Sequence, residues 1–275
     1  MQQSIDTIRN EILNAIKNDE LILPTMPEVA LKLRDVANDP NVDANRIATV
    51  ISSDAALTAR IIKIANSPLV RGVASVEDLQ MAISRMGVTY TSNLAIGIAM
   101  EQLFQATSEA VDDRLRRTWE HSTEVAGLSH VLCRHFTNLS PDQATLGGLV
   151  HEIGTLPILL WADDHDWDER LIDEVVERLH PEFGKMILEA WDFPEDLYQI
   201  PLGYTEFSRI VEETDYVDVV MVANLQTLAG SDHALASMDY SGIQAFENLG
   251  IEVDVVLANN DDLREEVTAA VDAFH

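Results

Sequence analysis

Apolar residues recur at helical spacing along most of the chain, beginning at its N-terminal end. Ile5, Ile8, Ile12 and Ile16 fall on one face of a 3.6-residue repeat. Strict alternation of polar and apolar residues, which is typical of half-buried strands, is hard to find anywhere. The pattern therefore predicts an all-α protein.

Start and stop signals divide this pattern into helices. Ser75 and Asp78 form a capping-box start and Gly87 is a C-terminal stop, so we expect one helix over 75–86 and the next over 88–105. Residues 106–117 are acidic and weakly apolar, which indicates a boundary. Further helices are expected over 119–136, 142–161 and 168–179, and amphipathic helices over 251–274. We therefore predict two helical lobes, residues 1–110 and 111–275.

Several long segments carry a resemblance to a known family. The stretch LPTMPEVALKLRDVANDPNVDANRIATVISSDAALTARIIKIANSP resembles the N-terminal half of an HDOD domain, a bacterial signalling module related to HD-type phosphohydrolases. The similarity continues through WEHSTEVAGLSHVL, LGGLVHEIGTLPIL and HPEFGKMILEAWDFPEDL, and covers about Leu21 to Gly250. The resemblance implies that the second lobe is an HD-like helical bundle.

The resemblance also implies where a metal centre would lie. In active HD proteins a histidine, a His-Asp pair and a later aspartate converge on divalent metal, which activates water. His121 stands at the first position and His151 at the second, but Glu152 replaces the paired aspartate and Asn224 replaces the last one. One carboxylate is lengthened and another is neutralised.

Other positions of the implied site have also changed. His180 matches a histidine used by two-metal relatives, whereas their later paired histidines correspond to Tyr204 and Thr205. Thr155 stands where active relatives commonly have a lysine, so a cation that could contact phosphate is missing. These changes imply that the usual hydrolytic chemistry has been lost.

Two interpretations of the remaining residues stay open. His121, His151 and Glu152 form an acceptable three-ligand set for a single divalent metal. Alternatively, His151 is a core histidine that is hydrogen-bonded to Glu152 or to a carbonyl group. We favour the second interpretation, which requires no cofactor, because the carboxylates that orient and neutralise such sites are missing.

Composition narrows the range of partners. The chain has 18 Lys and Arg against 47 Asp and Glu, a net charge of −29. Such a surface disfavours nucleic acid and anionic membrane, which are bound through clustered cations, although adaptation to salt would also produce this acidity. The single cysteine, Cys133, excludes an intrachain disulfide and a multi-thiolate metal site.

No apolar signal core begins the chain, and no uninterrupted apolar run is long enough to span a bilayer, so we expect a cytoplasmic protein. The favoured function is a non-catalytic signal-transduction module that binds a protein or a small molecule and acts on a signalling partner in trans. The alternative is a metal-dependent phosphohydrolase acting on a nucleotide or another phosphoester. The altered ligand positions favour the first, so we do not expect an enzyme.

Overall fold

A computed structural model describes the chain at residues 4–68, 70, 72, 75–105, 108–253, 261–272 and 274. Over these ranges the protein is all-α, with no strand, as predicted. The first elements in chain order are α1 (Ile5–Lys17), α2 (Glu28–Ala37), α3 (Ala44–Ile51), α4 (Ala55–Ala65), α5 (Leu79–Met86), α6 (Val88–Ala99) and the 3-10 helix η1 (Met100–Leu103). The next are α7 (Glu109–Phe136), α8 (Pro141–Val150), α9 (Thr155–Asp164) and α10 (Glu169–Ala190). The last are α11 (Glu195–Tyr198), α12 (Ile200–Gly203), α13 (Tyr216–Thr227), η2 (Ala234–Ser237), α14 (Gln244–Leu249) and α15 (Asp261–Asp272).

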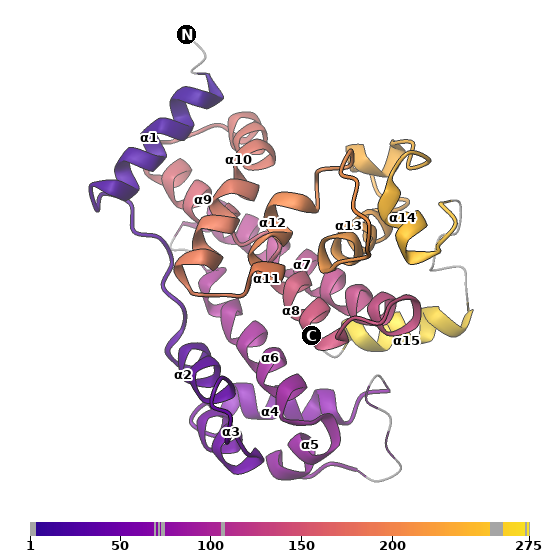
Figure 1. The fold of residues 1–275 in the computed structure, drawn as a ribbon. Helices are drawn as coiled ribbons and strands as arrows, with labels where there is room; N and C mark the ends of the chain where they lie inside the picture. The colour runs from indigo at the N-terminus through magenta and orange to yellow at the C-terminus, as the bar shows by residue number, and fades with distance from the viewer. Residues whose placement is uncertain are drawn as a thin grey trace.

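The helices gather into two groups joined by α6. Figure 1 shows α2 to α5 at one end of the molecule, with α6 leading from them toward the bundle formed by α7 and the later helices. α6 packs against α2 on one side and against α8 on the other. The division near residue 110 stays a prediction, because one continuous hydrophobic core runs from α2 through the bundle to Phe274.

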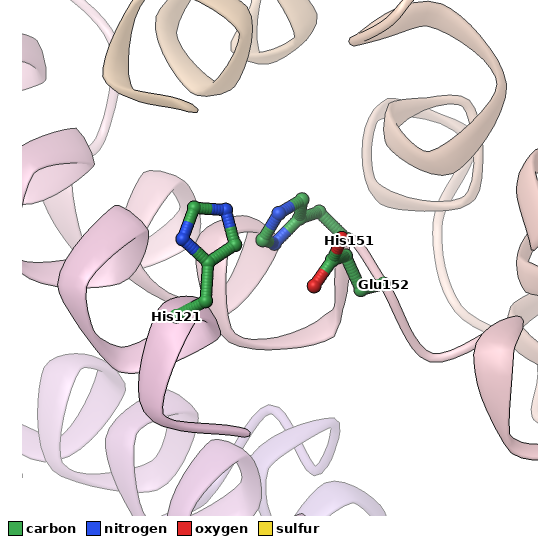
Figure 2. Close-up of side chains that lie close together, drawn as sticks. All are labelled: His121, His151 and Glu152. Atoms are coloured by element: carbon green, nitrogen blue, oxygen red, sulfur yellow. The ribbon is translucent and has the colours of Figure 1, made fainter. Parts of the chain in front are cut away.

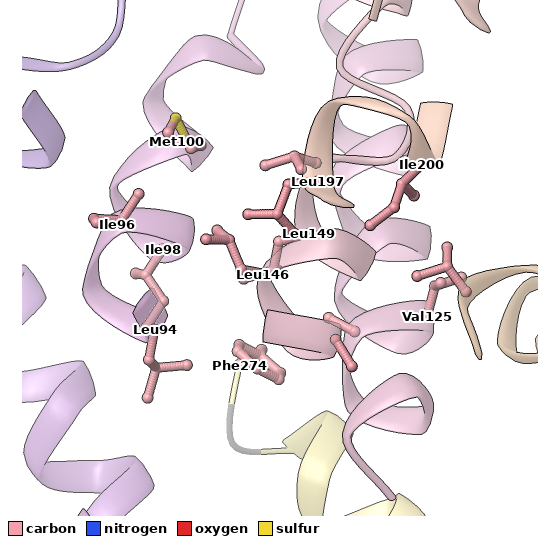
Figure 3. Close-up of a cluster of buried hydrophobic side chains, with 14 of the residues drawn as sticks. Leu94, Ile96, Ile98, Met100, Val125, Leu146, Leu149, Leu197, Ile200 and Phe274 are labelled. Atoms are coloured by element: carbon pink, nitrogen blue, oxygen red, sulfur yellow. The ribbon is translucent and has the colours of Figure 1, made fainter. Parts of the chain in front are cut away.

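Figure 3 shows part of this core, where side chains of α6 such as Leu94 and Ile98 lie near Leu146 and Leu149 of α8. Cys133, on α7, is fully buried in the same core. The first helix does not join it. Instead α1 lies against α10 and contributes Ile8 and Ile12 to a smaller hydrophobic cluster with residues of α9 and α10.

Several predicted helix boundaries were wrong. α5 begins at Leu79, because Asp78 and not Ser75 caps it by accepting a hydrogen bond from the Met81 N–H. The predicted helix over 142–161 is interrupted at residues 151–154, which form a turn between α8 and α9. The predicted helix over 168–179 continues to Ala190 as α10, despite the proline at position 181.

The segment 106–117 was expected to be a boundary, but α7 begins at Glu109. Ser108 caps the helix by accepting a hydrogen bond from the Val111 N–H. Arg116 and Arg117 then form ion pairs with Asp112 and Asp113, each one helical turn away. Val111, Leu115 and Trp119 recur every four residues and are all buried, so a narrow apolar stripe marks this part of α7 among many charged residues.

One stretch of the described chain, Pro141–Asp164, is long and apolar enough to cross a membrane by length and composition alone. However, 83% of its most apolar window is buried inside the protein. Helices at the centre of a folded domain have this same composition, because they are surrounded by other helices on every side. The stretch corresponds to α8 and α9, which carry much of the core.

The close approach of α7 and α8 depends on Gly148. A Cβ atom added at Gly148 would lie 2.5 Å from Ala126 Cα and 2.7 Å from Ala126 N. Both of these atoms belong to the backbone of α7, which cannot move aside as a flexible side chain could. The Gly147-Gly148 pair thus allows close helix packing, and only a residue without a side chain fits at position 148.

We expect Gly148→Ala to lower the free energy of unfolding by about 1–3 kcal/mol, because the overlap with α7 outweighs the roughly 1 kcal/mol that alanine gains over glycine in helix propensity. Gly242→Ala is the matched control, since nothing lies within 4 Å of the added atom there. Urea denaturation followed by circular dichroism measures both. Equal stability of Gly148→Ala and wild type would contradict the assigned constraint.

Candidate metal centre

Three side chains with metal-ligating groups meet where α7 passes the end of α8. His121 comes from the middle of α7, His151 is the C-terminal cap of α8, and Glu152 begins the turn toward α9. Their ligand atoms all lie within 4.8 Å of one another. Figure 2 shows the two imidazole rings and the carboxylate pointing toward the same space. The structure therefore brings together the three residues that the sequence analysis named as a ligand set.

His151 is the most constrained of the three. It has no exposed surface, and its Nδ1–H donates a hydrogen bond of 2.6 Å to the carbonyl oxygen of Gly148. Burial lowers the pKa of the imidazole to about 4, although the neighbouring Glu152 carboxylate raises it in part. The ring is therefore neutral at pH 7, with its lone pair on Nε2. Within the described part of the chain, this buried Nε2 has no hydrogen-bond partner.

His121 is half-buried and is held by α13. Its Nε2 lies 2.8 Å from Oδ1 of Asn224, which is itself buried. Because the amide oxygen only accepts, Nε2 is the donor in this pair. Asn224 thus takes part in the site through a hydrogen bond, without supplying the negative charge of an aspartate.

Glu152 is the only carboxylate of the group, and it is half-buried. Burial raises the pKa of this carboxyl, but the imidazoles of His121 and His151 together with more distant ones outweigh that effect and leave the pKa below its usual value. One of the distant imidazoles belongs to His233, which the sequence analysis did not identify. No motif marks His233, because it lies in the irregular segment after α13.

His180 is engaged elsewhere. Its Nδ1–H donates to the carbonyl oxygen of Val176 over 2.6 Å, and its Nε2 accepts a hydrogen bond of 2.6 Å from the hydroxyl of Tyr204. Both residues are buried, and burial lowers the pKa of His180 and raises the pKa of Tyr204 well above 10. The Tyr204 ring also meets the ring of His151 edge-on, with centroids 4.7 Å apart. Tyr204 therefore joins two of the histidines without being a charged ligand.

The remaining predicted positions contribute no charge. Thr155 is buried at the first position of α9, where its hydroxyl donates a hydrogen bond of 2.9 Å to the carbonyl oxygen of Glu152. It therefore helps to fix the turn that carries Glu152. Thr205 follows Tyr204 in the turn after α12 and is half-buried.

The donor set is chemically suited to one divalent metal ion. Two imidazoles and a carboxylate are a common protein ligand set for first-row transition metals. A metal-ligating histidine usually donates its other ring N–H to a carbonyl or carboxylate, as His151 does to Gly148. The free, buried Nε2 of His151 is the observation that fits an ion, since an unsatisfied buried polar atom is otherwise unfavourable.

Known proteins share this architecture. A solved structure from Shewanella amazonensis, named as a candidate metal-dependent phosphohydrolase, is similar over 98% of this chain and 99% of that one, with a TM-score of 0.87 and 27% identity. A second, from Marinobacter aquaeolei and named as a candidate signal transduction protein, covers 99% of this chain and 66% of that one, with a TM-score of 0.66 and 21% identity.

A curated relative from Treponema pallidum, described as an uncharacterized protein, is 22% identical over 223 residues. The match takes in 72% of this chain but only 42% of the relative, so this chain corresponds to less than half of that protein. The family model of the HDOD domain matches residues 23–204, which is more than half of this chain. The chain therefore belongs to the HDOD domain family.

Proposed function

We propose that the chain is a non-catalytic signal-transduction module that works by binding a signalling protein or a small molecule. The observation that carries this proposal is the loss of charged and free ligands at the candidate metal centre. Asn224 supplies an amide where a second carboxylate would balance a metal's charge, and Tyr204 occupies the lone pair of His180. The Marinobacter relative, whose name refers to signal transduction, has the same fold.

The partner acts in trans in this proposal, and both work in the cytoplasm. With a net charge of −29, the surface of the chain favours association with a partner that presents a basic face. Electrostatic attraction of this kind increases the association rate and contributes specificity more than it contributes affinity.

A metal-dependent phosphohydrolase is the second candidate. It is favoured by the Shewanella relative, which is named as one, and by the three ligand atoms of His121, His151 and Glu152 within 4.8 Å. When bound, a divalent ion at these residues would polarise a phosphate group and activate water. Against this candidate, Thr155 offers no cation to the phosphate, and its hydroxyl is bonded to the Glu152 carbonyl.

We predict that the protein has no phosphohydrolase turnover with magnesium, manganese, iron or nickel. Glu152→Asp alone should not create activity, because the site would still lack the second carboxylate at Asn224. Release of nitrophenol from p-nitrophenyl phosphate measures phosphomonoester hydrolysis, and its release from bis(p-nitrophenyl) phosphate measures phosphodiester hydrolysis. Metal-dependent turnover that disappears in folded His121→Ala and His151→Ala would instead establish the phosphohydrolase.

A second prediction concerns His151 as a structural group. His151→Ala should lower the free energy of unfolding at pH 7 by about 1–3 kcal/mol, because it removes a buried imidazole and its hydrogen bond to Gly148. Arg178→Ala, at an exposed position of α10, is the control and should change stability by less than about 0.5 kcal/mol. Denaturation in the presence of a chelator measures the unfolding free energy of each variant without any contribution from a bound metal ion.

The difference in unfolding free energy between wild type and His151→Ala should depend on pH. The pKa of His151 is about 4 in the folded protein, compared with about 6.5 in an unfolded chain. Between these values the unfolded chain binds a proton that the folded protein excludes, so the stability contributed by His151 is present above about pH 6.5 and decreases toward pH 4. The difference in unfolding free energy between wild type and His151→Ala should therefore become smaller from pH 7 to pH 4.5. A difference in unfolding free energy that does not change with pH would contradict the burial of a neutral His151 ring.

Another prediction follows from the charge. The protein should show no appreciable affinity for DNA, RNA or anionic vesicles at physiological salt, because binding to phosphate-rich surfaces needs clustered cations. Arg114, Arg116 and Arg117, which lie close together in sequence, are each paired with an aspartate. Gel-shift and vesicle-sedimentation experiments test this expectation, and salt-sensitive retention of DNA would contradict it.

A further inference from the structure

A cleft lies between the end of α4 and α15, and therefore between the two groups of helices that α6 joins (Figure 1). Its volume is about 1040 Å³, which is large enough for a small molecule, since such sites usually measure about 300–1,000 Å³. α15 is held on the bundle by α7, where a Cβ atom added at Gly127 would lie 3.0 Å from Val271 N. The cleft thus has one wall from each group, and a molecule bound in it would contact both.

Two cations border the cleft, Lys63 on α4 and Arg264 on α15. Within the described part of the chain neither forms an ion pair, although carboxylates outnumber cations 47 to 18 in the sequence. The negative end of the α4 dipole explains a lysine in the last turn of that helix. An arginine near the start of α15 faces the positive end of its helix and gains nothing from the dipole. An anion bound in the cleft would give both cations a partner.

The wall formed by α15 changes in charge along its length. Arg264, Thr268 and Asp272 all border the cleft, and they follow one another at intervals of four residues along one face of the helix. At a rise of 1.5 Å per residue, the first and the last of them are about 12 Å apart along the helix. The cleft therefore offers a cation at one end of this wall, a hydroxyl in the middle and a carboxylate at the other end.

Two further carboxylates border the cleft, those of Glu265 and Glu266. Glu266 is engaged by His135, whose Nε2 lies 2.7 Å from its Oε2. A ligand that is negatively charged throughout would be repelled by these groups and by the acidic surface as a whole. The cleft therefore suits a molecule with one anionic group and with N–H donors elsewhere.

A smaller cleft of about 380 Å³ lies on the other side of α15, against α7 and α13. It shares Arg264, Thr268 and Asp272 with the larger one. Among the described residues that line it, Arg264 is the only lysine or arginine, and Glu124 adds another carboxylate. The larger cleft is therefore the one in which two cations can meet a single anion.

We propose that the cleft between α4 and α15 binds a nucleotide, with its phosphate at Lys63 and Arg264 and its base toward Asp272. Phosphate accepts charge-assisted hydrogen bonds from lysine and arginine, and a base can donate N–H groups to a carboxylate. Pro68 and Ala269 add apolar surface for the ring. A nucleoside monophosphate carries its phosphate and its base at opposite ends, as this wall requires.

This inference rests on the proposed function, because a small molecule that contacts both groups of helices is a signal that a non-catalytic module can read. The nucleotide is bound and released unchanged, so no turnover is required. The cleft is formed by residues other than those of the candidate metal centre, and its occupancy can be measured without any metal ion.

Isothermal titration calorimetry with GMP, in the presence of a chelator, tests the cleft. Guanine is suited to the test because its N1–H and its N2 amino group donate from one edge, which matches the two oxygens of a carboxylate. Wild type should bind one equivalent of GMP, and guanosine, which lacks the phosphate, should bind at least about 10-fold more weakly. No binding of GMP at about 1 mM, or equal affinities for GMP and guanosine, would overturn the proposal.

Variants at exposed positions locate the bound nucleotide. Lys63→Ala and Arg264→Ala should each weaken GMP binding by about 10-fold, because each removes a charge-assisted hydrogen bond to the phosphate. Asp272→Asn should weaken it by a similar factor, because an amide nitrogen replaces one of the acceptors for the base. Arg178→Ala removes the same charge from an exposed position on α10 that does not border the cleft, and should bind GMP as wild type does.

Circular dichroism establishes that each variant is folded. Wild-type affinity in both Lys63→Ala and Arg264→Ala would contradict the assigned site, as would an equal loss of affinity in Arg178→Ala. The proposed function fails by a different result. Absence of GMP binding would leave a signalling protein as the partner of a non-catalytic module, whereas hydrolysis of the nitrophenyl phosphates would overturn the non-catalytic role and leave the binding measurement intact.

Discussion

The contact between α7 and α8 at Gly148 is the constraint on which the candidate site depends. The absence of a side chain at Gly148 lets the backbone of α7 approach at Ala126, and the Gly148 carbonyl accepts the hydrogen bond that orients His151. The same residue therefore sets the distance between the two helices and the direction of the ring at the end of one of them. His121, five residues before Ala126 on α7, is brought to His151 by this packing. A small change in helix separation would thus alter the site before it altered the fold.

Several of the buried polar groups around this contact are held by hydrogen bonds. His180, Tyr204, Asn224 and Thr155 are all buried, and each has a hydrogen-bond partner. Leaving such a group without a partner costs about 1–3 kcal/mol, so a folded domain tolerates few of them. His151 Nε2 has no partner within the described part of the chain, and neither do the buried hydroxyls of Ser122 and Ser129 on α7. Among these atoms, His151 Nε2 is the one whose residue belongs to the group of metal-ligating side chains formed with His121 and Glu152.

The sequence predicted the helical architecture, the pairing of His121 with His151 and the close packing at Gly147-Gly148, because each depends on local pattern or on a motif. It placed the start of α7 too late, because the many charged residues of this segment concealed the apolar stripe of Val111, Leu115 and Trp119, which the structure buries. It identified Tyr204 as a changed position but not its bond to His180, which lies 24 residues away in sequence on another helix. The sequence also could not show that Nε2 of His151 lacks a hydrogen-bond partner, because this depends on which groups surround the ring in the folded protein.

An ion at this position would connect chemistry to signalling without any turnover. It would link α7, through His121, to the end of α8, through His151 and Glu152, at the contact that also borders the core reached by α6. An ion that binds only the folded arrangement stabilises it by about 2.7 kcal/mol at a free concentration 100 times its Kd. That energy is large compared with the net stability of a domain, which is about 5–15 kcal/mol. Occupancy of a site that no longer hydrolyses could therefore still set how firmly the helices are held together, and with it the surface that a partner meets.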